Sequence, residues 1–314
     1  MGAKQSKRSP APAPPSSIHR PPTDLVSEHS VATSSPRITV DGRVYHNIEN
    51  SSYFFPRDEQ EQDRLNSQHF AIKALFGTNL LPSAEQAMPS DAKVLDVGCG
   101  PGSWVMEMAV DYPNAHFTGI DISDIFPTTI RPDNVSFELV NVLDGLPFDD
   151  NSFDLVHMRF LFTAIRTDEW TRVLNEIYRV LKPGGILQWG ELDLTEATQS
   201  PFIERFASAF HSIMQERQQD PWIAYKLEST LNQHQFEIVE QTKKKIQYGR
   251  NQDAIAQEML WVWSTTLQSL RPLVIAKLCP EDPTQYESLV QRYLQDCTDC
   301  NWFMQVWFIT GRKL

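Results

Sequence analysis

The sequence predicts an α/β fold built on a doubly wound, mostly parallel β-sheet. This prediction rests on three observations. Short apolar runs alternate with helical patterns from residue 92 onward. A glycine-rich turn over residues 98–102 directly follows the first of these runs. Acidic or amide residues end the next two runs, at the edge where open α/β sheets bind ligands. The arrangement is Rossmann-like.

The expected elements follow in order along the chain. Strands are predicted at 93–97, 116–120, 135–140, 153–158 and 186–191, with helices at 103–111 and 167–181, the second closed by a Lys-Pro-Gly-Gly sequence. Later we expect helices over 201–218 and 222–234, a strand near 236–246, a helical insert over about 252–296, and a last antiparallel strand at 303–310. Parallel neighbours require right-handed crossovers.

The N-terminal part of the chain divides in two. Residues 1–40 are rich in Pro, Ser and Ala with almost no large apolar residues, so we expect a disordered tail. Residues 41–91 are predicted to form a helical cover, with a helix from Asp58 to Phe76 that shares Leu65 and Ile72 on one face. The main domain is then expected over residues 92–314.

Composition and charge restrict the function. A formal net charge of -12 argues against nucleic acid as a partner, because phosphate backbones are held mostly by Lys and Arg. No apolar run approaches the ~20 residues that cross a bilayer, and no secretory signal is evident, so a cytoplasmic protein with reduced thiols is expected. Cys297 and Cys300 form a C-x-x-C pair without a second pair. We expect them to be buried or incidental thiols, and we expect no metal site.

The glycine turn carries the first chemical signal. Gly98, Gly100 and Gly102 let the main chain approach a ligand closely. A dinucleotide site would place its third glycine where Ser103 stands, which disfavours a nicotinamide cofactor. Asp96, just before the turn, would repel a pyrophosphate and attract an ammonium group.

Two further strand ends complete a nucleoside site. Asp121 ends the second strand, where an acid accepts hydrogen bonds from ribose hydroxyls. Asn141 and the main chain of Val142 follow the third strand, where they suit an adenine ring. Each residue alone also fits a turn or a helix cap, so the prediction rests on the three features occurring in order.

At this point the sequence resembles a known family. The runs VLDVGCGPGSW (94–104), GIDIS (119–123), LPFDDNSFDLVHMRF (146–160) and VLKPGG (180–185) look like the ordered motifs of class I methyltransferases that use S-adenosylmethionine (SAM). Residues 53–69 resemble the segment before this domain in fungal LaeA-like methyltransferases. The resemblance implies a seven-stranded class I sheet and SAM as cofactor. The residues expected to bind SAM are Asp96, Gly98, Cys99, Gly100, Gly102, Asp121, Ile122, Asn141, Val142 and His157.

Three residues are candidates for catalysis beside the methyl group. They are His157 and Arg159 at one strand end and Glu191 at the next. The alternatives are a ring packed beside the cofactor for His157 and a structural ion pair for Arg159 and Glu191. Tyr53 and His69 of the cover are expected to be packing residues.

We therefore expect methyl transfer from SAM to a small molecule. The alternative is a SAM-binding regulatory protein that acts through protein partners with little or no turnover. Five tryptophans lie in the last third of the chain: Trp222, Trp261, Trp263, Trp302 and Trp307. We expect them to belong to the hydrophobic core, because an aromatic stripe is more often part of a core than of a ligand cage.

The first residues, Met1-Gly2-Ala3-Lys4-Gln5-Ser6, match the N-myristoylation pattern. A myristoyl group on Gly2 together with Lys4, Lys7 and Arg8 would give weak, reversible membrane association, because one acyl chain binds only marginally. A chance match in a tail is the alternative, and a nuclear location stays open.

Overall fold

The computed structural model describes residues 36–48, 51–194, 198, 200–251 and 253–314. Gly2, Lys4, Lys7 and Arg8 lie outside these residues, as does the predicted tail up to residue 35. The described chain from Pro36 onward belongs to one compact unit.

A seven-stranded mixed sheet forms the centre of this unit, with the order β5-β4-β3-β6-β7-β9-β8. The first five strands in this order are parallel, and β9 is antiparallel to both of its neighbours. The predicted α/β class and the antiparallel last strand are confirmed, although this strand lies between β7 and β8. The bounds are β3 Lys93–Val97, β4 His116–Asp121, β5 Val135–Leu139, β6 Phe153–Arg159, β7 Leu181–Asp193, β8 Phe236–Gln247 and β9 Phe303–Lys313.

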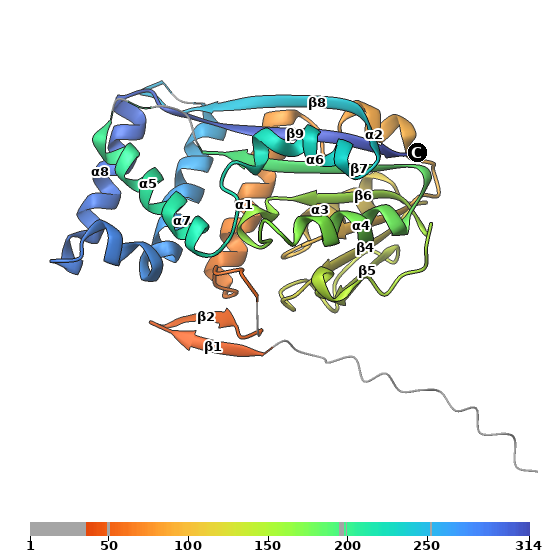
Figure 1. Ribbon diagram of the computed structural model, residues 1–314, viewed down its shortest axis with the longest axis horizontal. Helices are drawn as coiled ribbons and strands as arrows, with labels where there is room; N and C mark the ends of the chain where they lie inside the picture. The colour runs from red at the N-terminus through yellow and green to blue at the C-terminus, as the bar shows by residue number, and fades with distance from the viewer. Residues whose placement is uncertain (1–35, 49–50, 195–197, 199, 252) are drawn as a thin grey trace, which may run out of the picture. The chain divides into compact units, whose positions relative to one another are not determined.

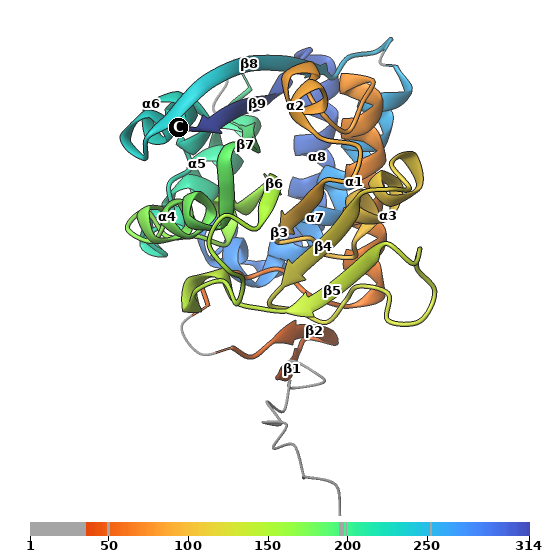
Figure 2. The ribbon, with the colours of Figure 1, turned by 90° about the vertical axis from the view of Figure 1, so that its right-hand side faces the viewer.

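Helices cover both faces of the sheet (Figure 2). Successive strand residues point to opposite faces. Val94 therefore packs into the hydrophobic cluster on one face of the sheet, which contains Trp104 of α3. Leu95 packs into the hydrophobic cluster on the other face, which contains Val173 of α4. One face carries α1 Glu59–Phe76, α2 Pro82–Ala87 and α3 Ser103–Asp111, and the other carries α4 Trp170–Val180 and α6 Leu227–Gln233.

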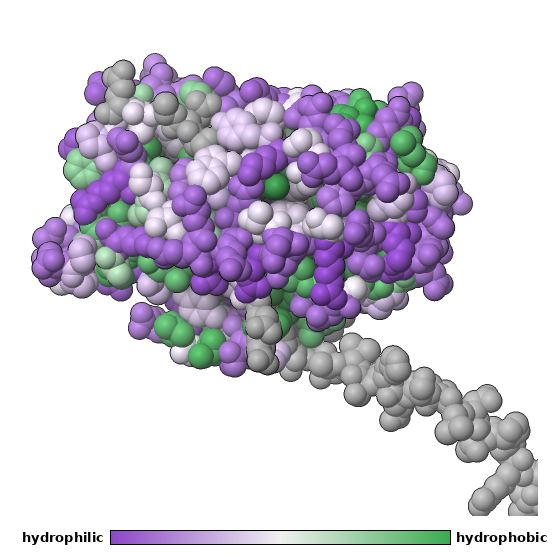
Figure 3. Space-filling model, in the orientation of Figure 1, coloured by the Kyte–Doolittle hydropathy of each residue, from purple (hydrophilic) through white to green (hydrophobic). Residues whose placement is uncertain are grey.

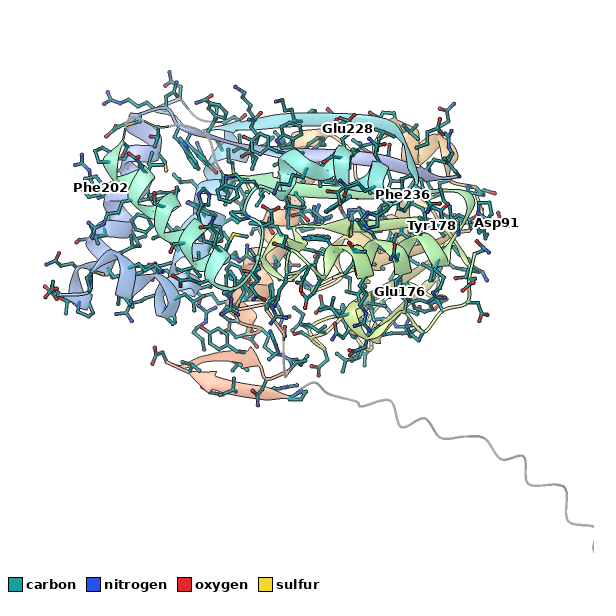
Figure 4. All side chains as sticks on the ribbon, viewed as in Figure 1. Asp91, Glu176, Tyr178, Phe202, Glu228 and Phe236 are labelled. Carbon is teal, nitrogen blue, oxygen red and sulfur yellow. The ribbon has the colours of Figure 1, made fainter. Side chains whose placement is uncertain are left out.

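Local signals set several element ends. Asp58 accepts a hydrogen bond from the amide of Glu61 and caps α1, and Gly77 ends that helix in the left-handed conformation. On the other face, Tyr178 of α4 meets Phe236 of β8 edge-on, with ring centroids 5.2 Å apart (Figure 4). This contact fastens α4 to the antiparallel side of the sheet.

A helical insert stands at one edge of the sheet (Figure 1). The insert predicted over about 252–296 contains α7 Ala254–Leu278 and α8 Tyr286–Asp299, and α5 Pro201–Glu216 joins them. The three helices pack on one another, and α7 packs on α1. Gln247 pairs with Phe303, and Asp193 pairs with Gln305. The insert therefore leaves the sheet at the edge where the parallel strands end.

An N-terminal hairpin was not expected. β1 Arg37–Val40 and β2 Arg43–His46 pair antiparallel around Asp41 and Gly42, both at positive φ. The tail predicted over residues 1–40 therefore includes β1 at its end, and the cover predicted as helical over 41–91 begins with the turn and β2. An Asp-Gly pair between two short runs is a strong hairpin signal, because both turn residues tolerate positive φ.

The remaining elements are short 3₁₀ turns: η1 Val142–Asp144, η2 Leu161–Thr163, η3 Ile223–Lys226 and η4 Pro283–Gln285. The face in Figure 3 is mostly hydrophilic, with apolar residues in small separate groups. None of the helices in the described part of the chain combines the length and apolarity that a membrane span requires.

Candidate cofactor site

A cavity of about 430 Å³ lies at the edge where the parallel strands end. This volume is within the range of small-ligand sites. Gly102 and Glu191 do not line it. Ten of the residues predicted from the sequence do, namely Asp96, Gly98, Cys99, Gly100, Asp121, Ile122, Asn141, Val142, His157 and Arg159.

The glycine turn joins β3 to β4. The amides of Gly98 and Cys99 both donate to the Ile120 carbonyl, at 2.8 and 2.9 Å. Gly102 begins α3 at a φ of 81°, and a Cβ there would lie 2.5 Å from the ring of Phe137. Gly102 therefore allows close packing under the turn instead of lining the cavity.

Asp121 is fixed at the end of β4. Its carboxylate accepts from the Gly100 amide at 2.9 Å and from the Ser123 amide at 2.8 Å. Burial raises the pKa of Asp121 to about 6, against the effect of these two amides. The carboxylate is held beside the glycine turn, as a ribose-binding acid requires.

Asn141, which follows the end of β5, caps the next short helix. Its side-chain oxygen accepts from the Leu143 amide at 3.1 Å and caps η1, and its side-chain nitrogen donates to Asp144 at 3.1 Å. Asn141 and Val142 both line the cavity. The capping role considered for Asn141 is therefore present, and its side-chain orientation is set by the turn.

Asp96 and His157 form a buried pair between neighbouring strands. They are register partners on β3 and β6, with His157 Nδ1 and Asp96 Oδ1 at 2.7 Å. The His157 ring stacks on Trp104, with centroids 4.0 Å apart and planes at 4°. Burial lowers the pKa of His157 even though Asp96 raises it. The ring is then neutral, Nδ1 donates to Asp96, and Nε2 is a buried acceptor without a partner among the described residues.

Arg159 joins a second polar network that links β6 to α1 and α3. It donates to Nδ1 of His69 at 3.2 Å, and His69 Nε2 meets Glu107 at 2.7 Å. Lys73 and Asn79 also donate to Glu107. Burial, followed by the nearby Arg159 cation, lowers the pKa of His69 to about 4, and burial lowers the pKa of Arg159 to about 10. His69, expected only to pack, thus orients Arg159 at the cavity.

Glu191 is placed differently from the expectation. Residues 188 and 190 of β7 pair with His157 and Arg159, so Glu191 points to the opposite face of the sheet. Its carboxylate accepts from the indole of Trp189 at 2.8 Å and from the Leu161 amide at 3.1 Å, and burial raises its pKa to about 8. The prediction that Glu191 faces the site beside the methyl group is therefore wrong, because Glu191 does not line the cavity.

The contacts of Glu191 give it a positioning role. Phe160 occupies the left-handed region at a φ of 59°, which costs about 1 kcal/mol or more for a bulky residue. The next two amides, of Leu161 and Phe162, both point at the Glu191 carboxylate. Glu191 therefore holds the turn by which Phe160, Leu161 and Phe162 line the cavity.

The segment after β2 forms another wall. Tyr53, Phe55 and Arg57 line the cavity, and Arg57 pairs with Asp124 in the loop that follows β4. This ion pair ties the N-terminal cover to the side of the site that contains Asp121. Tyr53, expected to be a packing residue, is therefore part of the site.

These residues fit SAM. The Asp121 carboxylate suits the ribose hydroxyls, and the Asp96 carboxylate suits the ammonium of the methionine part. Gly100 adopts a φ of 55° and leaves room for a ligand against the main chain. The buried Nε2 of His157 is a further polar atom for a ligand group.

Residues 94–185 match a family model described as a methyltransferase domain. This match spans β3 to the start of β7, the part of the sheet that carries the predicted cofactor residues. Residues 94–185 therefore form a methyltransferase domain. The residues that line its cavity fit SAM as the cofactor.

Several curated proteins share this domain. The secondary metabolism regulator laeA of Coprinopsis cinerea is 32% identical over 197 residues, which cover 57% of this chain and 48% of that protein. Methyltransferase str2 of Strobilurus tenacellus is 32% identical over 54% of this chain and 61% of its own length. The protein-methionine methyltransferase laeA of Emericella nidulans is 32% identical over 48% and 40%. The chain matches about half the length of these relatives, and the resemblance to LaeA-like proteins is confirmed.

The cysteines lie apart from the site, except Cys99 in the glycine turn. Cys297 is buried in α8, and burial raises its pKa to about 12, while Cys300 is exposed. The described part of the chain contains no group of three or more His, Cys, Asp or Glu residues placed to hold a metal ion.

Proposed function

We propose that this protein transfers the methyl group of SAM to a small-molecule acceptor. The observation that supports this most is the continuity of the cavity. Its lining includes the cofactor positions Asp96 and Asp121 and also Phe210 and Val262 of the helical insert. A cofactor and a second molecule therefore have adjoining walls in one cavity, where the acceptor would be aligned with the methyl group.

The bound SAM would supply an electrophilic methyl carbon, and its sulfur keeps the electron pair of the broken bond. The chain aligns the acceptor and, for a hydroxyl, receives its proton. His157 Nε2 suits that task, because Asp96 holds Nδ1 and fixes the tautomer with the lone pair on Nε2. Arg159 is held in place by His69 and contributes positive charge nearby.

Labelled SAM incubated with a metabolite extract and with a protein extract is the direct test. We expect label in the small-molecule fraction and release of S-adenosylhomocysteine (SAH). In His157→Ala, turnover at saturating SAM should fall by about tenfold or more, a larger effect than any change in the Kd for SAM. His116→Ala, an exposed residue on β4, is the matched control. Equal turnover in His157→Ala and the parent would remove His157 from the reaction.

The second candidate is a regulatory protein that acts on or through proteins. It is supported by two of the relatives, a secondary metabolism regulator and a protein-methionine methyltransferase. Label confined to the protein fraction would favour this candidate, and SAM binding without any label transfer would favour a regulator without turnover.

We also propose reversible membrane association of a cytoplasmic protein through N-myristoylation. The supporting observation is the sequence pattern with Gly2 and Ser6, followed by Lys7 and Arg8. Intact mass spectrometry of protein from its own cells should show the added acyl mass, and Gly2→Ala should move the protein to the soluble fraction with SAM binding unchanged. An unmodified or acetylated N-terminus would contradict this proposal.

A further inference from the structure

The cavity has a second wall beyond the cofactor positions. The end of β7, α5, α7 and the start of β9 supply it. Its apolar members are Leu192, Leu194, Phe210, Met259, Val262 and Met304.

The sheet order places this wall to one side of the cofactor positions. Asp121 lies on β4 and Asp96 on β3, whereas the wall begins at β7 and β9. Strands β3, β6 and β7 lie between β4 and β9 in the sheet. Because neighbouring strands are ~4.8 Å apart, these four steps place β9 roughly 19 Å from β4. β6, with His157, lies between the two. The wall therefore adjoins the β6 side of the site and is remote from the ribose acid.

The helical side of this wall offers little to a charged ligand. Among the described residues, its α5, α7 and β9 members include no acid or base. Its polar groups already have partners, because Thr266 donates to the Val262 carbonyl at 2.8 Å and the Trp263 indole donates to Tyr293 at 2.7 Å. A charged group placed here would lose its hydration without compensation.

The cations near this wall are engaged. Arg64 makes bonds of 2.6–3.0 Å to the buried Glu61. Arg159 is bonded to His69 and lies 5.4 Å from the centre of the Phe160 ring. The part of the wall supplied by α5, α7 and β9 is therefore mainly apolar and includes the aromatic rings of Phe210 and Trp263.

We propose that this wall is the acceptor site and that the acceptor is an uncharged, planar, mainly apolar molecule that bears one nucleophilic group. The apolar body lies against α5 and α7, and the nucleophilic group faces His157 on β6. This inference rests on the proposed function, which it deepens by naming the substrate class.

Equilibrium binding of two matched probes to the full chain, with the cofactor positions saturated by SAH, tests it. 2-Naphthol is neutral near pH 7, and 2-naphthoate has the same rings with a negative charge. We expect 2-naphthol to bind about tenfold or more tightly than 2-naphthoate. Equal affinities, or tighter binding of 2-naphthoate, would overturn the inference and point to Arg159 as an anion site.

Two neighbouring residues of α7 give a matched pair of variants. Val262 is 1% exposed and lines the cavity, whereas Trp261 is 44% exposed. Val262→Phe should fill the site and weaken 2-naphthol binding by about tenfold or more, with SAH affinity within about twofold of the parent. Trp261→Phe should change neither. Unchanged 2-naphthol affinity in a folded Val262→Phe variant would overturn the inference.

Val262→Thr is the milder variant if Val262→Phe fails to fold. Its added hydroxyl should weaken 2-naphthol binding by about threefold or more with little change of volume, and unchanged binding would again overturn the inference. SAH titration of the parent separates the two levels. Loss of SAH binding would overturn the proposed function itself, whereas normal SAH binding without preference for 2-naphthol would overturn the acceptor class alone.

Discussion

The two ends of the cavity are built in different ways. At the end formed by β3 and β4, a carboxylate and main-chain amides from the ends of two successive strands hold one another, as Asp121 does with Gly100 and Ser123. At the end formed by the helical insert, apolar side chains from distant segments meet, such as Leu192, Phe210, Val262 and Met304. The difference separates a cofactor end, set by main-chain geometry at strand ends, from the proposed acceptor end, which depends on the packing of side chains from distant segments.

The largest expected effect concerns the cofactor end. Gly100→Val should abolish measurable SAM binding, a loss of about 100-fold or more, because a branched side chain would occupy the space of the ligand and resist a φ of 55°. The nearest atom to a Cβ at Gly100 is 3.7 Å away, so the protein itself leaves room for the first carbon. Calorimetric titration with SAM measures this effect, and parent-like binding would contradict the cofactor assignment.

Gly102→Ala is the matched comparison within the same turn. Its added carbon would press on Phe137 at 2.5 Å, and the residue has a φ of 81°. We expect a loss of about 1–3 kcal/mol in the free energy of unfolding, read from chemical denaturation. If Gly100→Val destabilised the fold as much as Gly102→Ala, loss of binding in the former would no longer report on the cofactor.

A smaller effect is expected at Asp121. Asp121→Ala should weaken SAM binding by about 1.5–3 kcal/mol through loss of charge-assisted hydrogen bonds, with the fold retained. The pKa of this carboxyl is raised to about 6, so the acceptor form is lost as the pH falls through that value. Affinity for SAM should therefore decrease from about pH 7.5 to about pH 5.

Asp121→Asn supplies the control for the pH dependence. His157 and His69 also gain protons as the pH falls, but both are retained in this variant. The decrease in affinity due to Asp121 should therefore be absent in Asp121→Asn. An equal decrease in variant and parent would assign the pH dependence to the histidines.

The same contrast between local and tertiary construction explains what the sequence predicted. Gly98 to Gly102, Asp121 and Asn141 were placed correctly at strand ends, because each follows a short apolar run that is itself a strand. The network of His69, Glu107 and Arg159 had no local signal, since it depends on how α1 packs against α3 and β6. The β1–β2 hairpin did have a signal, the Asp-Gly turn, which the polar composition of the preceding tail obscured.

Glu191 shows the limit most clearly. Its position at the end of β7 was predicted, but its direction was not. Strand residues alternate between faces, so the pairing register of β7 with β6 decides whether Glu191 or Gly190 shares the face of His157. A single sequence sets the strand to within one or two residues, which is insufficient to fix the face.

The smallest expected effect is at Glu191, at the junction of the two ends. Its pKa is raised from 4.5 to about 8, so the stabilisation from its neutral form is complete below its unfolded pKa and is lost as the pH rises toward 8 and above. Glu191→Gln cannot ionise, and its side-chain oxygen still accepts from Trp189 and Leu161. Near pH 5 the variant should be about 1 kcal/mol less stable than the parent, because the weaker bond to Phe162 is lost. Between about pH 5 and pH 9 the parent should lose about 1–3 kcal/mol more than the variant, so the two stability curves converge or cross. Chemical denaturation across this range measures the difference.

Two outcomes would contradict this role of Glu191. Parallel stability curves would mean that Glu191 is ionised at every pH and that its three hydrogen-bond donors outweigh the effect of burial. A loss of turnover without any change of stability would mean that Glu191 takes part in the reaction itself.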